Sequence, residues 1–176
     1  TALQRSDAYR DVVPYYLLQI EFHEGNYRYV VENGGKLVQR AVPERRKELE
    51  RVIAESWFRL GDFNKTIEHL DAFAAAGGEL DRDGSYLMGF SLYRTARYPE
   101  AAEYLRRACG AEDALTQNAS YHLADCYLRA GDKRAAMHTF AMAADDRFDA
   151  TIAEDALFNY GKLQYELGGG AFNGAI

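Results

Sequence analysis

Some side chains of this sequence could bind a metal ion. His122 and Cys126 are four residues apart with Asp125 between them, and an i, i+4 pair on a helix can share one metal. A structural zinc site needs four ligands, and no third or fourth ligand lies nearby in the sequence. Cys126 falls at a position that we expect to pack inside the fold, and the other three histidines form no cluster. The sequence therefore predicts no metal site.

Sequence motifs that are typical of catalysis and cofactor binding are also absent. The sequence contains no nucleophile elbow, no phosphate-binding loop and no dinucleotide fingerprint. Gly168, Gly169 and Gly170 form a glycine run, but no strand pattern precedes it and no Lys-Ser or Lys-Thr follows it. We interpret this run as a loosened turn, and we expect no cofactor and no enzymatic activity.

The composition excludes several classes of protein. The chain has 176 residues, of which 48% are hydrophobic and 27% are charged, so it should bury a core rather than stay disordered. A formal net charge of -6 argues against nucleic-acid binding, which normally needs a basic patch. No apolar run approaches about 18 residues, so no segment is expected to span a membrane. The two cysteines, Cys109 and Cys126, are too few for a disulfide scaffold.

A repeat in the sequence positions the residues that could contact a partner. Similar phrases recur, such as RLGDFNKTIEHL at 59–70 and LRAGDKRAAMHTF at 128–140. Apolar residues at helical spacing lie on both sides of each turn, and a steady period of this size indicates a repeat array. Each unit is therefore predicted to be a helix, a tight turn and a second antiparallel helix. The turn residues are separated by 36, 35, 35 and 37 positions: Gly25, Gly61, Ala96, Gly131 and Gly168.

The pattern predicts helices and no strands, because sustained period-2 alternation is absent. We expect helices at about 9–24, 27–40, 43–60, 63–76, 84–96, 98–109, 114–130, 133–145, 150–167 and 171–176. They form one array with repeats at about 11–46, 47–81, 82–116 and 117–152 and a partial repeat at 153–176.

Small residues at the helix crossings, such as Gly89 and Ala124, should let the two helices of a pair approach closely. Gly34 and Gly35 fit less well, because glycine inside a helix costs about 1 kcal/mol relative to alanine. They predict a bent or frayed second helix in the first repeat.

One repeat carries a motif with a known counterpart. It reads Leu-Ala, then Tyr, Gly and Ala, at Leu123, Ala124, Tyr127, Gly131 and Ala136. This order resembles the tetratricopeptide repeat, and the resemblance covers residues 11 to 176. It implies an all-α fold, a right-handed superhelical solenoid of antiparallel helix pairs with a concave groove lined by the first helices. The chain is also similar to long bacterial envelope-associated repeat proteins, which favours a periplasmic or cell-envelope location over the cytoplasm.

The first helices carry an aromatic column beside an arginine column. Residues at positions 0, 4, 7 and 8 of each first helix share one helical face. Tyr and Arg are frequent anchors in protein interfaces, because they combine contact area with directed hydrogen bonds. We predict that this face binds a peptide or partner segment, with acidic groups beside Arg59, Arg94 and Arg129. The candidate residues are Tyr15, Arg51, Tyr86, Phe90, Arg94, Tyr121, Asp125, Arg129, Phe158 and Lys162.

A purely structural explanation of these residues stays open. The aromatic residues at position 7, Phe22, Phe58 and Tyr93, could pack between neighbouring first helices. The arginines could pair with carboxylates such as Glu55 and Asp125, and exposed pairs of that kind contribute only about 0–1 kcal/mol.

Two functions are compatible with these features. The leading one is a non-catalytic protein-interaction scaffold that binds a peptide or partner segment in its groove. The alternative is a structural or assembly module that stacks with further repeats or self-associates, with Phe172 and Ile176 in the contact. The chain begins at Thr1 and stops inside a predicted helix, so we expect it to be part of a longer protein. The Lys and Asn arrangement with which some members of the family bind chaperone tails is not matched, so that partner is not expected.

Overall fold

The computed structural model describes residues 12–172, and the chain divides into two compact units, Thr1–Leu80 and Asp81–Ile176. Nine helices and no strand occur among the described residues, which confirms the predicted all-α fold of helix pairs. None of the helices within residues 12–172 is long and apolar enough to cross a bilayer.

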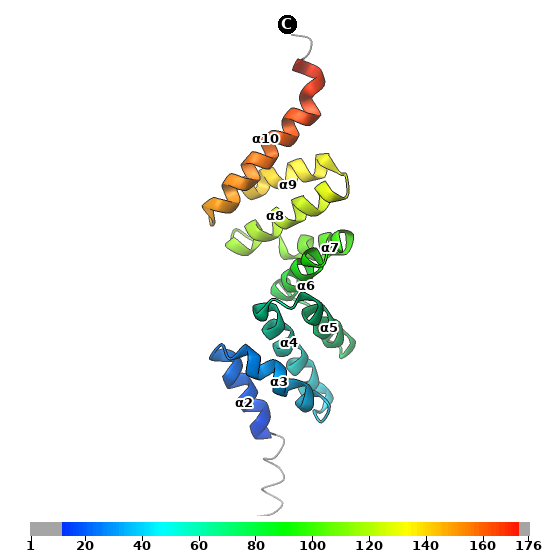
Figure 1. Cartoon of the computed structure of the whole chain (residues 1–176), viewed down its shortest axis with the longest axis vertical. Coiled ribbons are helices and arrows are strands. Elements are labelled where there is room, and N and C mark those ends of the chain that lie inside the picture. Colours follow the sequence, from blue (N-terminus) through cyan, green and yellow to red (C-terminus); the bar gives the residue numbers. More distant parts are fainter. Residues whose placement is uncertain (1–11, 173–176) are drawn as a thin grey trace, which may run out of the picture. The chain divides into compact units, whose positions relative to one another are not determined.

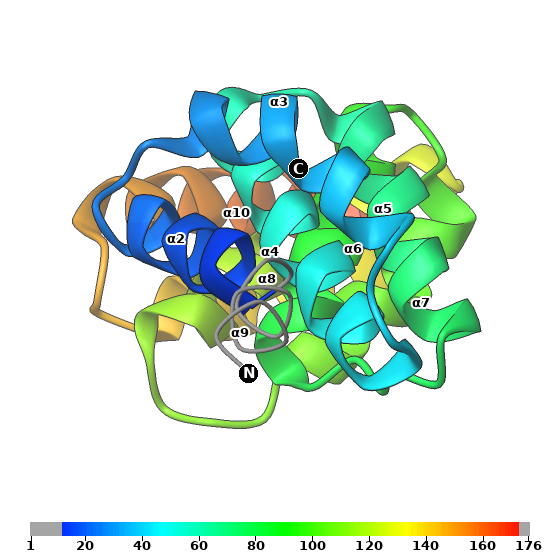
Figure 2. The same cartoon turned by 90° about the horizontal axis from the view of Figure 1, so that it is seen from below.

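The first unit contains two helix pairs (Figure 1 and Figure 2). Its helices are α2 (Val12–His23), α3 (Tyr27–Val38), α4 (Pro43–Leu60) and α5 (Phe63–Ala75). Each helix packs on the next one along the chain. The core between α2, α3 and α4 is built from Leu18, Val30, Leu49 and Ile53.

The second unit contains two further pairs and a long final helix (Figure 1). Its helices are α6 (Arg82–Arg94), α7 (Tyr98–Ala108), α8 (Ala114–Arg129), α9 (Lys133–Asp145) and α10 (Ala150–Phe172). Here α6 also packs on α8, and α8 packs on α10, so the first helices of successive repeats are neighbours. One core cluster of this unit contains Ala124, Ala136, Phe140, Ala143, Ala156 and Leu163.

The predicted helix ends between residues 27 and 145 lie within two residues of those observed. The start of the first predicted helix, at residue 9, lies outside the described residues. Because turn residues with positive φ occur at Gly25, Gly61, Ala96 and Gly131, the predicted turns before residue 145 are confirmed.

The predicted turn at Gly168–Gly170 is wrong, because α10 continues through it. Gly131 follows α8 with a φ of 82°, and the carboxylate of Asp132 accepts a backbone N–H three residues later at 3.0 Å, which caps α9. Gly168 is followed by another glycine, so no side chain stands there to cap a new helix. Residues 173–176, which belong to the predicted last helix, lie outside the described part of the chain.

Glycines allow the closest approaches between paired or neighbouring helices. A Cβ atom at Gly89 of α6 would lie 2.8 Å from the backbone nitrogen of Leu105 in α7. A Cβ atom at Gly34 of α3 would lie 2.6 Å from Cδ1 of Ile53 in α4. At Gly89 the obstacle is backbone, so no side chain fits there, whereas at Gly34 the side chain of Ile53 would have to move. Gly34 thus serves packing, and α3 runs through it as one continuous helix where fraying was predicted.

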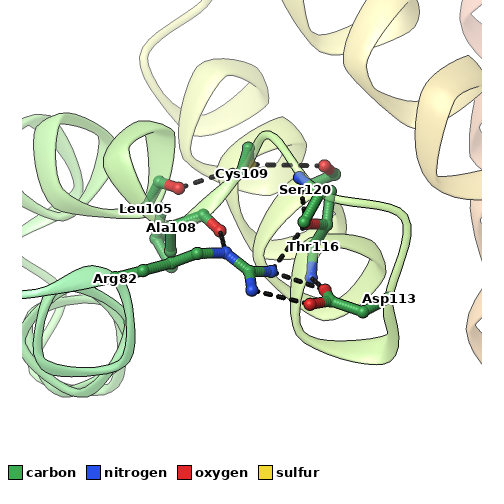
Figure 3. Close-up of polar contacts among 8 residues, drawn as sticks. Arg82, Leu105, Ala108, Cys109, Asp113, Thr116 and Ser120 are labelled. Carbon is green, nitrogen blue, oxygen red and sulfur yellow. Dashed lines mark hydrogen bonds and ion pairs between the residues drawn. The ribbon is translucent and has the colours of Figure 1, made fainter.

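Arg82, at the start of α6, ties this helix to the start of α8. Its Nε donates to the carbonyl oxygen of Ala108 at 2.8 Å, and its guanidinium pairs with the carboxylate of Asp113 (Figure 3). Asp113 caps α8 by accepting the N–H of Thr116 at 2.9 Å. The guanidinium of Arg82 holds the pKa of Asp113 well below its usual range. The connection from α7 to α8 is therefore fixed to α6.

Gln117 stands 35 residues after Arg82, in the same position of the next repeat, and is fully buried. Its Nε2 lies 3.2, 2.7 and 3.1 Å from the carbonyl oxygens of Ala143, Asp146 and Asp149, while its Oε1 accepts the N–H of Asp149 at 2.7 Å. These bonds fix the connection from α9 to α10 against α8. Two different side chains in one repeat position thus set the register of α6, α8 and α10.

Replacing Gly89 by alanine should lower the free energy of unfolding by about 1–3 kcal/mol, because the new methyl group overlaps Leu105. The same replacement at Gly161, the matching position of α10, should raise it by up to about 1 kcal/mol, because a Cβ atom there meets no atom of the described residues within 4 Å. Chemical denaturation of both variants measures the difference. Equal effects would mean that this position does not set the spacing of the pair.

Candidate functional site

Eight of the ten predicted contact residues lie in the second unit, on α6, α8 and α10. The other two, Tyr15 and Arg51, lie in the first unit and have partners there. The hydroxyl of Tyr15 donates to Glu48, and Nε of Arg51 donates to Oε1 of Glu55 at 3.1 Å. Burial, followed by the contact with Glu48, raises the pKa of Tyr15 to about 12.

Asp125 of α8 is the centre of a polar network that links two first helices. Its Oδ2 accepts hydrogen bonds from the hydroxyl of Tyr93 on α6 and from Nε of Arg129, both at 2.8 Å. The guanidinium of Arg129 also lies over the ring of Tyr98, 4.9 Å from its centroid. Burial, with Asp125 adding to it, raises the pKa of Tyr93 to about 12. The structural explanation is confirmed for Arg129, which pairs with a carboxylate.

An aromatic layer connects α6 to α8 beside this network. The rings of Tyr86 and Phe90 stack with centroids 5.7 Å apart, and the hydroxyl of Tyr86 donates to Oδ1 of Asn118 at 2.7 Å. The guanidinium of Arg94 lies over the ring of Phe90 at 5.7 Å, and the Arg94 side chain is exposed. Burial raises the pKa of Tyr86 to about 12. The layer therefore holds its rings in fixed positions and places a cation at its edge.

His122 lies inside this layer, one position after Tyr121. Its ring centroid is 4.9, 4.7 and 5.4 Å from those of Phe90, Tyr93 and Tyr121. Among the described residues, no hydrogen-bond partner reaches its buried Nδ1. Burial lowers the pKa of His122 to about 4, so the imidazole is neutral at pH 7. The sequence suggested His122 only as a metal ligand. His122 directly follows Tyr121, which belongs to the predicted aromatic column. This neighbouring position is the sequence signal that could have placed His122 in the layer.

The other candidate metal ligand, Cys126, is a packed side chain. It is 1% exposed, and burial raises the pKa of its thiol to about 12. Within residues 12–172 no group of three or more His, Cys, Asp or Glu side chains is arranged to hold a metal ion. The packing expected for Cys126 is therefore confirmed.

The aromatic residues at position 7 pack across the turn between the two helices of their own pair. Each ring meets an aromatic residue at the start of the second helix, with centroids 5.8 Å apart: Phe22 with Tyr27, Phe58 with Phe63, and Tyr93 with Tyr98. Tyr93 also contacts His122 on the neighbouring first helix. Packing between neighbouring first helices, which was one explanation for all three, is confirmed for Tyr93.

The two candidate residues on α10 are exposed to solvent. Phe158 is 71% exposed, and Lys162 is exposed as well. Tyr121 on α8 packs against the core cluster that includes Ala156 and Leu163 of α10, and burial raises its pKa. The eight residues thus combine held aromatic rings with exposed cations. Aromatic residues and arginine are side-chain types that are enriched in protein interfaces.

The neutral state of His122 makes stability depend on pH. The unfolded chain binds a proton near pH 6.5 and the folded chain only near pH 4, so this contribution is complete above pH 6.5 and is lost as pH falls to about 4. The expected loss is about 3 kcal/mol of unfolding free energy. Denaturation across this range should show a shallower pH dependence for His122→Phe than for the unmodified protein. Identical slopes for the unmodified protein and His122→Phe would contradict the assignment.

Comparisons with known proteins agree with this fold. Residues 118–146 match the family model of the tetratricopeptide repeat. No curated protein sequence matches the chain significantly.

Solved structures of other proteins are similar in fold to this chain. The crystal structure of YrrB, described as a TPR protein with an unusual peptide-binding site, has a TM-score of 0.71 at 14% identity over 94% of this chain and 84% of that chain. MamA has a TM-score of 0.61 at 15% identity, covering 88% of this chain and 96% of its own. BtubC from P. vanneervenii has a TM-score of 0.62 at 14% identity, covering 94% of this chain and 78% of its own.

At these identities the structural likeness establishes the fold, and the family match identifies one repeat within it. Tetratricopeptide repeats generally serve as non-catalytic scaffolds for protein interactions, and protein partners are therefore the class that the fold supports. Residues 118–146 thus match the tetratricopeptide repeat, and the chain as a whole is similar in fold to solved structures that include a TPR protein.

Proposed function

We propose that the protein binds an extended segment of a partner protein on the face formed by α6, α8 and α10. We call this face the first-helix wall. It consists of the eight candidate residues of the second unit: Tyr86, Phe90, Arg94, Tyr121, Asp125, Arg129, Phe158 and Lys162.

The fixed positions of the rings carry this proposal. Tyr86 is held by Asn118, and Tyr93 is held by Asp125, so the aromatic surface of α6 and α8 is ordered before any ligand arrives. Side chains that are already ordered lose less conformational entropy on binding. Tyr and Phe also offer large contact area, which suits them as anchors.

The charge of the wall favours an acidic partner segment. Arg94 and Arg129 are exposed, one on each of two adjacent helices, in a chain whose net charge is -6. A guanidinium carries five N–H donors, so the bond from Nε of Arg129 to Asp125 leaves donors for a ligand. Binding should therefore weaken as salt concentration rises.

A second candidate function is assembly, and exposed residues of α2 favour it. Val13, Tyr16, Leu17 and Ile20 are 57%, 58%, 40% and 52% exposed and follow i, i+3, i+4, i+7 spacing. Such an apolar stripe is typical of a contact surface. Light scattering separates the two functions, because self-association raises the mass with concentration and a constant monomer mass argues against assembly.

The experiment for the first-helix wall uses peptides selected from a random library against the whole chain. Arg94→Glu should weaken binding of the selected acidic peptides by about tenfold or more, because it places a negative charge beside their carboxylates. Tyr121→Ala should weaken binding by a similar factor through lost contact area. Fluorescence anisotropy measures both affinities.

The matched control is Arg134→Glu, since Arg134 is exposed on α9, a second helix that contributes no residue to the wall. It makes the same change of charge and should leave affinity nearly unchanged. If Arg94→Glu and Arg134→Glu have the same effect, recognition does not depend on the first-helix wall.

A further inference from the structure

Positive charge is concentrated where α3 ends and α4 begins. Residues 36–47 contain five cations and one carboxylate, which gives this segment a net charge of +4 in a chain whose net charge is -6. We call residues 36–47 the basic connection. Its cations are Lys36, Arg40, Arg45, Arg46 and Lys47. Lys36, Arg40 and Arg46 are exposed, and the other two are half-buried.

The carboxylates that follow the basic connection on α4 are bound to other side chains. Glu48 accepts a hydrogen bond from the hydroxyl of Tyr15, and Oε2 of Glu50 lies 2.6 Å from Nδ1 of His69. Among the described residues, no ion pair joins a carboxylate to any cation of the basic connection. The positive charge of this segment is therefore not compensated by neighbouring side chains.

The matching connections between later repeats carry an aspartate where this one carries an aliphatic residue. The carboxylates of three aspartates accept a backbone N–H in the first turn of the helix that follows: Asp81 before α6, Asp113 before α8 and Asp149 before α10. Before α4 this position is Val42, which provides no side-chain cap and is 55% exposed. Valine is unfavourable at a helix start. Its presence there indicates a role other than stabilising the fold.

The basic connection presents an exposed apolar tip between cations. Val42 and Pro43 are both exposed, Arg40 precedes them by two residues, and Arg46 follows Pro43 by three. Residues 39–42 join α3 to α4, and these two helices pack on each other. The tip therefore lies at the ends of the two helices and not in a groove between them.

An anionic lipid bilayer is the partner that matches both the charge and the tip. Lysine and arginine are attracted to anionic headgroups, and an apolar side chain among them can enter the boundary between headgroups and acyl chains. A nucleic-acid backbone would use the cations but not the aliphatic tip. Protein interfaces are depleted of lysine. The net charge of -6 does not prevent the contact, because charges more than about 10 Å away are screened at about 0.1 M salt.

We propose that the basic connection binds the surface of an anionic lipid bilayer, with its arginines at the phosphate groups and Val42 at the level of the headgroups. This surface lies in the first unit and is separate from the first-helix wall, whose eight residues belong to the second unit. The contact is peripheral, so it requires no membrane-spanning helix.

The experiment measures cosedimentation of the whole chain with vesicles of phosphatidylcholine alone or mixed with phosphatidylglycerol. The chain should bind only the mixed vesicles, and binding should weaken as salt concentration rises. Arg40→Glu combined with Arg46→Glu should weaken binding by at least about tenfold, because each cation near an anionic surface contributes a factor of about five. Both side chains are exposed, so the melting temperature of the double variant should stay nearly unchanged.

The matched control combines Arg134→Glu with Arg147→Glu. Both arginines are exposed and lie in the second unit, so this double variant makes the same change of net charge away from the basic connection. Its affinity for the mixed vesicles should change by less than about twofold, because distant charges are screened. An equal loss in the two double variants would mean that binding depends on net charge alone.

Val42→Ser tests the apolar tip without changing the charge. Serine can cap α4, so the melting temperature should stay the same or rise, whereas binding to mixed vesicles should fall by about fivefold through the lost apolar contact. A purely structural role of Val42 would not produce this combination.

Three results would overturn the proposal: no binding to mixed vesicles, an equal loss in the two double variants, or unchanged binding by Val42→Ser. Polyglutamate and a DNA duplex supply anions without a bilayer. If either of them binds through Arg40 and Arg46 while vesicles do not bind, the partner belongs to that class of polymer and the membrane assignment is wrong.

Discussion

The two helices of each pair approach one another closely, and the other features of the fold follow from that approach. Gly89 faces the backbone of Leu105, and Ala124 and Ala136 are both fully buried in one core cluster. Small residues at the crossing leave no room between the helices, so the large residues on either side bury their surface against the partner helix. This stabilises each hairpin and leaves the opposite side of the first helix free to meet the next repeat.

The register between successive first helices depends on a different kind of contact. Arg82 uses an ion pair and Gln117 uses buried amide bonds, yet both reach from the same repeat position to the connection after the second helix. Gln117 is fully buried, and buried polar groups are costly unless their hydrogen bonds are satisfied, so this anchor favours one register. The ion pair of Arg82 with Asp113 is partly exposed and fixes the register through its bond geometry. That register lets Tyr93 reach Asp125 on the next helix, and it assembles the aromatic layer that we propose as a binding surface.

Local signals in the sequence predicted most of the helices. Gly61 and Gly131 end helices with positive φ, and the aspartates after them act as caps, so both features could be recognised from residue type alone. Gly168 was misread, because the period suggested a turn and the missing cap was not considered. The partners of Asp125 could not be predicted, since Tyr93 lies 32 residues away and its approach depends on the register of two helices. The position of His122 next to Tyr121 was a usable signal, but its contacts with Phe90 and Tyr93 of α6 depend on the same register of two helices.

A double-mutant cycle between positions 89 and 105 examines the close approach itself. Unfolding free energies are needed for the unmodified protein, Gly89→Ala, Leu105→Ala and the double variant. If close approach of the two backbones sets the spacing of the pair, Gly89→Ala should cost at least about 1 kcal/mol in both backgrounds, because the atom nearest to the new methyl group is the backbone nitrogen of residue 105, which Leu105→Ala leaves in place. A cost that disappears when residue 105 is alanine would contradict the claim that small residues at the crossing determine how these helices pair.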